Sequence, residues 1–159
     1  IAKEIYNLIA YQFEGSCFLT NTRETSKQDL GLVQLQKTLL REILGKVGSL
    51  KFDEVDQGIN VMKKRLRSKK VLLILDDVDQ LVQLETLAGK HDWFGLGSRI
   101  IITTRDRNLL TKHEVSLMYK VEELDHNKAL QLFSLHAFKK DRPEDDYLEL
   151  TEHVIQYTG

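Results

Sequence analysis

Two adjacent carboxylates, Asp76 and Asp77, directly follow a continuous apolar stretch, Val71–Leu75. The stretch is too short for a lone helix and rich in branched residues, which is typical of a strand buried on both faces of a parallel sheet. Carboxylates at the C-terminal end of such a strand face the crevice in which open α/β sheets bind ligands. We expect a magnesium ion or a water awaiting activation there, although an acid pair alone also fits a solvated turn.

A second predicted buried strand, Ser98–Thr104, ends in two threonines and is followed at once by Arg105. If the two strands are neighbours, their polar ends share one crevice. Magnesium needs only one or two protein carboxylates, and the second acid can orient or polarise an attacking water. An arginine opposite can bind phosphate through two parallel hydrogen bonds and stabilise its charge. This combination favours a nucleoside-triphosphate site, whereas Arg105 alone also fits a surface ion pair with Asp106.

The loop that usually cradles nucleotide phosphates is missing from these residues. A Gly-x-x-x-x-Gly-Lys-Ser/Thr pattern appears nowhere, because Gly45-Lys46 and Gly89-Lys90 lack both the earlier glycine and the following hydroxyl residue. The chain also opens inside a helical pattern at Ile1, without an N-cap. We therefore expect a fragment that holds half of a site, with the phosphate-binding loop upstream of Ile1.

The elements that would position these residues alternate between strands and helices. Apolar spacing and turn residues predict the following elements: an opening helix to Phe13, a strand at 16–20, helices over 32–43 (ending at Gly45 and Gly48), 55–66 and 81–87 (ending at Gly89), a short strand at 119–121, a helix capped by Asp125, and another over 147–157 leading to a capping Gly159. Such alternation predicts a three-layer α/β domain with a parallel sheet, and the last two helices predict the start of a separate helical module.

Composition bounds the function classes. The chain has 159 residues, 42% of them apolar, which predicts one folded domain with a sizeable core. Its 23 basic and 24 acidic residues nearly balance, so no general attraction to nucleic acid or anionic membrane is implied. Cys17 is the only cysteine and cannot form an internal disulfide, which favours a reducing, cytosolic setting. We expect Cys17 to be a buried structural thiol, and the five histidines show no metal-binding spacing.

Taken together, the motifs resemble the nucleotide-binding (NB-ARC) domain of plant disease-resistance proteins with leucine-rich repeats. The resemblance is carried by four blocks in the family's order: Gly15–Leu19 with Thr22–Glu24 and Leu35-Gln36, the Walker B-like Leu72–Asp79, Gly97–Asp106, and Tyr119–Leu124 with Ala129–Phe133 and Ala137-Phe138. In that family an Asp at the position of Asp79 goes with the branch that carries an N-terminal Toll/interleukin-1-receptor-like (TIR) domain.

The resemblance implies a P-loop NTPase-like sheet, here incomplete, over residues 1–122, and the start of the helical ARC module over residues 123–159. It implies that Asp76 supports Mg²⁺ through water, that Asp77 is the base or water-orienting group, and that Arg105 senses the γ-phosphate. Asp76, Thr103 and Thr104 would bind the nucleotide, ADP at rest and ATP when signalling, with slow hydrolysis resetting the switch.

The resemblance further implies partners in the full-length receptor: its own TIR and leucine-rich-repeat domains, and other copies of itself on activation. We also expect a cytoplasmic location, with the nucleus as a second compartment, and no membrane span, because no apolar stretch approaches membrane-spanning length. We expect weak ATPase activity in the full-length protein and none in this fragment. Two alternatives stay open, a phosphoacceptor receiver-like signalling domain and a degenerate interaction module that binds no nucleotide.

Overall fold

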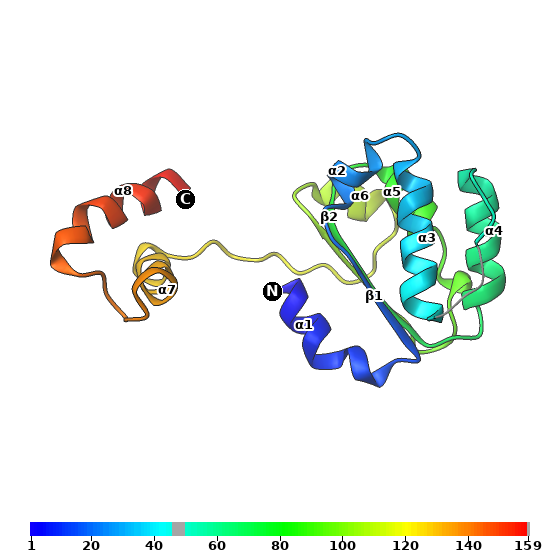
Figure 1. The fold of residues 1–159 in the computed structure, drawn as a ribbon, viewed down its shortest axis with the longest axis horizontal. Coiled ribbons are helices and arrows are strands. Elements are labelled where there is room, and N and C mark those ends of the chain that lie inside the picture. The colour runs from blue at the N-terminus through cyan, green and yellow to red at the C-terminus, as the bar shows by residue number, and fades with distance from the viewer. Residues whose placement is uncertain (46–49, 159) are drawn as a thin grey trace. The chain divides into compact units, whose positions relative to one another are not determined.

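The computed structural model describes residues 1–45 and 50–158 and divides the chain into two compact units, residues 1–116 and residues 117–159 (Figure 1). The expected caps at Gly48 and Gly159 lie outside the described residues. The first unit contains the sheet, and the regular elements described in the second are all helices. The expected boundary at residue 122 and the assignment of the second unit to an ARC module stay predictions.

The sheet of the first unit is parallel, in the order β1 (Gly15–Leu19), β2 (Val71–Val78), β3 (Arg99–Thr104). Strand β2 lies between the other two, and every side chain from Val71 to Leu75 is fully buried. This confirms the predicted α/β fold with a parallel sheet. Strand β2 continues three residues beyond the predicted apolar stretch, because its pairing with β3 resumes at Val78 after an irregularity.

Helices cover both faces of this sheet, so the predicted three layers are present (Figure 1). The helical segments of the first unit are α1 (Ala2–Ile9), η1 (Ala10–Gln12), α2 (Thr22–Ser26), α3 (Gly31–Leu44), α4 (Val55–Leu66), α5 (Leu81–Ala88), η2 (His91–Trp93) and α6 (Arg107–Lys112). Helix α1 packs on one face, where the Tyr6 ring meets the Phe18 ring edge-on at 5.6 Å between centroids. Helices α3, α4 and α5 enclose the main core on the other face.

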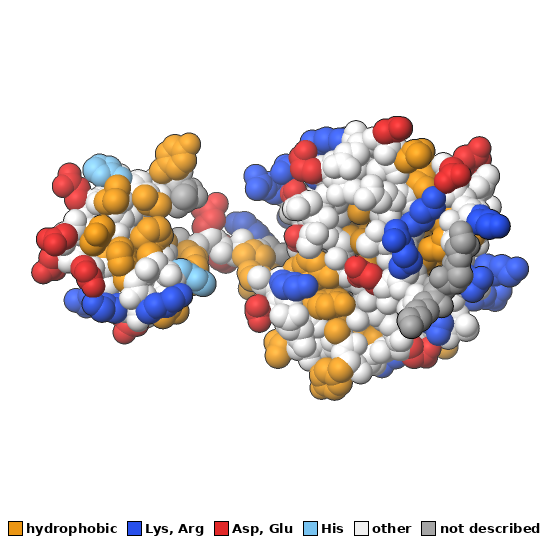
Figure 2. All heavy atoms as spheres, viewed as in Figure 1, with side chains coloured by type: hydrophobic (Ala, Val, Ile, Leu, Met, Phe, Trp, Pro, Cys, Tyr) orange, Lys and Arg blue, Asp and Glu red, His pale blue; other side chains and the backbone are white. Residues whose placement is uncertain are grey.

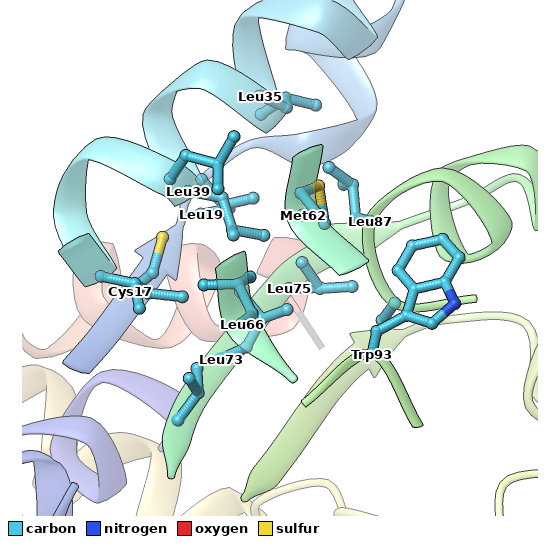
Figure 3. Close-up of a cluster of buried hydrophobic side chains, with 14 of the residues drawn as sticks. Cys17, Leu19, Leu35, Leu39, Met62, Leu66, Leu73, Leu75, Leu87 and Trp93 are labelled. Carbon is cyan, nitrogen blue, oxygen red and sulfur yellow. The ribbon is translucent and has the colours of Figure 1, made fainter. Parts of the chain in front are cut away.

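The alternation of side chains along each strand sorts the residues between these two layers. Cys17 and Leu19 of β1 join Leu73 and Leu75 of β2 in the main core, together with leucines from α3 and α5 (Figure 3). Leu72 and Ile74 are equally buried but lie outside this cluster. The strand is therefore apolar on both faces, as expected of a central strand in a parallel sheet.

A buried glutamine joins three helices of the main core. The Gln36 amide nitrogen, on α3, donates hydrogen bonds to the carbonyl of Val55 at 3.1 Å and to that of Thr86 at 3.3 Å. Gly58 of α4 lies so close that a Cβ there would stand 1.9 Å from Gln36 Oε1 and 2.8 Å from the Phe52 ring. The absence of a side chain at position 58 is therefore what lets α4 approach α3.

The second unit is built from α7 (His126–Phe138), η3 (Asp145–Tyr147) and α8 (Leu148–Thr158). Asp125 caps α7 as predicted, because its carboxylate accepts a hydrogen bond from the Lys128 amide at 2.9 Å. Apolar side chains gather on the visible surface of this unit (Figure 2), and the exposed ones include Leu132, Leu135, Leu148 and Leu150. Within the described ranges, no helix of either unit is long and apolar enough to cross a bilayer.

The predicted strand at Tyr119–Val121 is wrong. Residues 117–125 form neither helix nor strand, and the side chains of Leu117 and Tyr119 are 84% and 87% exposed. A strand exists only through hydrogen bonds to a neighbouring strand, and the described residues offer this segment none. Its alternating apolar pattern is therefore not sufficient to make it a strand.

We predict that Gly58→Ala destabilises the protein by about 2 kcal/mol, although alanine in a helix is normally more favourable than glycine by about 1 kcal/mol. The sign reverses because the added Cβ displaces Gln36, whose two hydrogen bonds hold it in place. The matched control is Asn60→Ala, at an exposed position of the same helix, which should be neutral or slightly stabilising. Urea unfolding of both variants is the measurement, and a stabilising Gly58→Ala would contradict the packing argument.

Candidate functional site

The two adjacent acids lie at a β-bulge where β2 ends. Leu75 pairs with Ile102 and Val78 pairs with Thr104, so β2 contains one more residue than β3 between these two pairs. Asp77 lies in this bulge with a left-handed backbone, φ of 57°, a conformation that aspartate tolerates better than most residues. Bulges often re-aim side chains next to functional sites. Here the bulge places two consecutive carboxylates at the carboxyl edge of the sheet.

One hydroxyl connects both acids to the neighbouring strand. Thr103 Oγ1 accepts a hydrogen bond from the Asp77 amide at 2.9 Å and donates one to Asp76 Oδ1 at 2.6 Å. The same side chain therefore stabilises the bulge and holds the Asp76 carboxylate in one orientation. The structure thus joins three of the predicted site residues, Asp76, Asp77 and Thr103, in one cluster.

The partner of the Asp77 carboxylate is Arg23, a residue to which the sequence motifs assign no role. Arg23 Nη2 lies 3.1 Å from Asp77 Oδ2, and the two side chains are only 34% and 29% exposed. Arg23 comes from α2, the short helix that follows β1. Since β1 and β2 are parallel neighbours, the segment after β1 lies at the same edge as the end of β2. That topology is the signal that could have identified Arg23.

Thr104 and Arg105 are not joined to the acids. The Thr104 hydroxyl accepts a hydrogen bond from the Asp106 amide at 3.0 Å, in the turn that begins α6. Arg105 is exposed, and its side chain makes no hydrogen bond or ion pair with another described residue, so the alternative pairing with Asp106 is not formed. Arg105 directly follows the residue that pairs with Val78, and it therefore starts from the same edge of the sheet as the acids.

A second network ties the turn after β2 to α2. The fully buried Gln83 donates from its amide nitrogen to Asp79 Oδ1 at 2.8 Å and to Ser26 Oγ at 2.7 Å. Its amide oxygen accepts from the backbone amides of Asp79 and Gln80, which caps α5. Asp79 therefore has a structural use in this chain, separate from the acid pair.

The donor set at the edge fits a magnesium ion held mainly by water and phosphate. Thr103 occupies Asp76 Oδ1 and leaves Asp76 Oδ2 without a donor among the residues that the structure describes. Carboxylate oxygen is a ligand that Mg²⁺ accepts, and one such ligand suffices where phosphates and waters supply the rest. No group of three or more His, Cys, Asp or Glu side chains that could enclose a metal occurs in the described ranges.

Cys17 is buried in the main core with no exposed area. Burial, reinforced by the nearby Glu42 carboxylate, raises the pKa of the Cys17 thiol well above its usual range. Since the thiolate is the nucleophilic form, this thiol has no reactive role in the folded protein.

Comparison with known proteins identifies a family. A model of the NB-ARC domain matches residues 1–143. The chain is similar to three plant proteins: disease resistance protein RPV1 of Vitis rotundifolia (45% identical over 157 residues, 99% of this chain and 11% of that protein), TMV resistance protein N of Nicotiana glutinosa (41% over 164 residues, 99% and 14%), and disease resistance protein RPP4 of Arabidopsis thaliana (42% over 161 residues, 100% and 14%). The chain therefore spans only 11–14% of the length of these relatives.

The neighbouring threonines Thr103 and Thr104 allow a matched test of the bulge. Thr103→Val keeps the shape but leaves the Asp77 amide and Asp76 Oδ1 without their partner, so we expect a loss of about 1–2 kcal/mol in the free energy of unfolding. Thr104→Val removes a hydrogen bond that water can replace and should cost under about 0.5 kcal/mol. Urea denaturation measures both, and equal losses would contradict the role assigned to Thr103.

Proposed function

The chain belongs to the NB-ARC domain family, and from this premise we propose that it is part of a nucleotide-operated switch in a plant disease-resistance receptor. The switch holds ADP at rest and ATP when signalling, and slow hydrolysis returns it to rest. The observation that carries the proposal is the acid pair at the carboxyl edge of a parallel sheet, with Asp76 and the backbone of Asp77 both bonded to Thr103. Ligands bind at this edge in open α/β sheets.

The residues at the carboxyl edge of the sheet would have separate roles in nucleotide binding and hydrolysis. Asp76, with one oxygen held by Thr103, would bind Mg²⁺ through water, and the ion would neutralise phosphate charge when bound. Asp77 would orient the attacking water or accept its proton. Arg105, which is exposed and has no partner among the described side chains, is free to reach a γ-phosphate. Thr103 and Thr104 would line the nucleotide site.

The remaining features of the switch concern the whole receptor. Asp79 favours membership of the family branch that carries a TIR domain. The full-length receptor would also contain a leucine-rich-repeat region and would self-associate on activation. We place the receptor in the cytoplasm or nucleus. A phosphate-binding loop elsewhere in the full-length receptor would supply the other half of the site, since residues 1–159 contain none.

The proposal is tested by the nucleotide content of the receptor that carries these residues. Denaturation of the purified receptor should release stoichiometric ADP. The folded receptor should bind ADP or ATP only when Mg²⁺ is present. A receptor that contains no nucleotide and binds none would show instead a degenerate interaction module.

Asp77→Asn in that receptor should lower the rate of ATP hydrolysis by about 100-fold, because the neutral amide cannot accept a proton from water. ATP should then accumulate on the protein and bias signalling towards the active state. Single-turnover hydrolysis and the ratio of bound ATP to ADP are the measurements. Unchanged turnover would remove Asp77 from the reaction.

Arg105→Ala should weaken ATP binding about 10-fold or more and leave ADP binding nearly unchanged, because only ATP carries the phosphate that this guanidinium would contact. Titration of each nucleotide by calorimetry measures the two affinities. The control is Arg107→Ala, an exposed arginine at the start of α6. Equal losses for ATP and ADP would assign Arg105 a structural role.

A further inference from the structure

Each acid of the edge has its own fixing partner, and the two partners differ in kind. Asp76 is held by the Thr103 hydroxyl at 2.6 Å, a hydrogen bond that leaves the acid one free oxygen. The Asp77 carboxylate is instead paired with the Arg23 guanidinium at 3.1 Å. A positive φ of 57° at Asp77 takes its side chain out of the regular strand pattern, so the sheet itself does not orient it.

The short helix that carries Arg23 is anchored on both sides of that residue. Thr22 is fully buried, and its hydroxyl donates to the Leu19 carbonyl at the end of β1, at 3.3 Å. Ser26 donates to the Arg23 carbonyl at 3.0 Å and accepts from the buried Gln83 amide at 2.7 Å. Arg23 therefore extends from a backbone that is fixed relative to β2, and its pairing with Asp77 is built into the fold.

We propose that Arg23 is a positioning residue for Asp77, holding the carboxylate in the orientation in which it acts on the attacking water. The inference rests on the proposed function, because it assumes that Asp77 serves hydrolysis. In this role Arg23 acts through its ion pair with Asp77. An ordered carboxylate matters because small misplacements of a reacting group cost large factors in rate.

The same ion pair could serve only to hold α2 against β2. That structural role and the positioning role predict different results for catalysis. Loss of a purely structural ion pair lowers stability and leaves the rate of hydrolysis per folded, nucleotide-bound molecule unchanged. A lost positioning group lowers kcat with little effect on KM, and a lysine, which retains the positive charge, restores part of the rate.

The experiment compares Arg23→Gln, Arg23→Lys and the control Glu24→Gln in the receptor that carries these residues. Glu24 is the matched control because its carboxylate lies 3.2 Å from Arg23 Nε but is 61% exposed and does not contact Asp77. We expect Arg23→Gln to lower kcat by about 10- to 100-fold with KM nearly unchanged, Arg23→Lys to recover part of that loss, and Glu24→Gln to match the wild type. A wild-type kcat in Arg23→Gln overturns the inference.

A double-mutant cycle tests whether Arg23 acts through Asp77. In the Asp77→Asn background, Arg23→Gln should cause no further loss of kcat, because the group it positions is already gone. A second, equal loss in that background would also overturn the inference. Urea unfolding of the wild type, the two single variants and the double variant gives a readout that needs no nucleotide. The shifts in unfolding midpoint caused by Arg23→Gln and Asp77→Asn should be non-additive. Additive shifts would mean that the two side chains do not interact.

These outcomes separate the inference from the function on which it rests. A wild-type receptor that binds no nucleotide overturns the proposed function and the positioning role together, even where the unfolding shifts are non-additive. The positioning role alone is overturned if the wild-type receptor hydrolyses ATP, the Asp77→Asn variant does not, and the Arg23→Gln variant still does.

Discussion

One extra residue in a buried strand, stabilised by one hydroxyl, is the constraint on which the edge of this sheet depends. Without the bulge, Asp76 and Asp77 would point to opposite faces of β2, as successive residues of a strand do. With it, Asp76 bonds to Thr103 on β3 while Asp77 pairs with Arg23 on α2, the helix that follows β1. The central strand thus presents one acid toward each neighbouring element, and both remain at the edge where parallel strands bring their ligand-binding ends together.

The bulge keeps its place because the strand before it cannot slip. Val71 to Leu75 are fully buried, and a shift by one residue would exchange the set packed under α1 with the set packed under α3, α4 and α5. These two layers demand different shapes, since the first is closed by the rings of Tyr6 and Phe18 and the second by leucines and Met62. Close packing of the two layers therefore fixes the register of β2, and this register determines where the polar groups at the end of the strand lie.

The fold was largely predictable from sequence, whereas the contacts of the site were only partly so. Apolar periodicity and capping residues predict all three strands and the longer helices, because local chemistry and burial agree in those segments. The short helices α2 and α6 were not predicted, because five or six residues are too few to show an apolar period. They failed at Tyr119–Val121, where an alternating pattern has no partner strand. Asp76, Asp77 and Thr103 were predictable from their positions at strand ends. Arg23 was not singled out, because its role follows from the order of the strands and from a left-handed residue at the bulge, neither of which a motif records.

The buried amide of Gln83 has a consequence for how such chains can diverge. Its two donor bonds and its acceptor positions are all occupied, by Ser26, Asp79 and the backbone of the turn. Exchanging any one of these side chains for an apolar residue would leave a polar group stranded in the interior, at a cost that natural variation rarely tolerates. Positions 26, 79 and 83 should therefore covary among relatives as a heritable set, so that a segment transplanted from one receptor to another must bring all three.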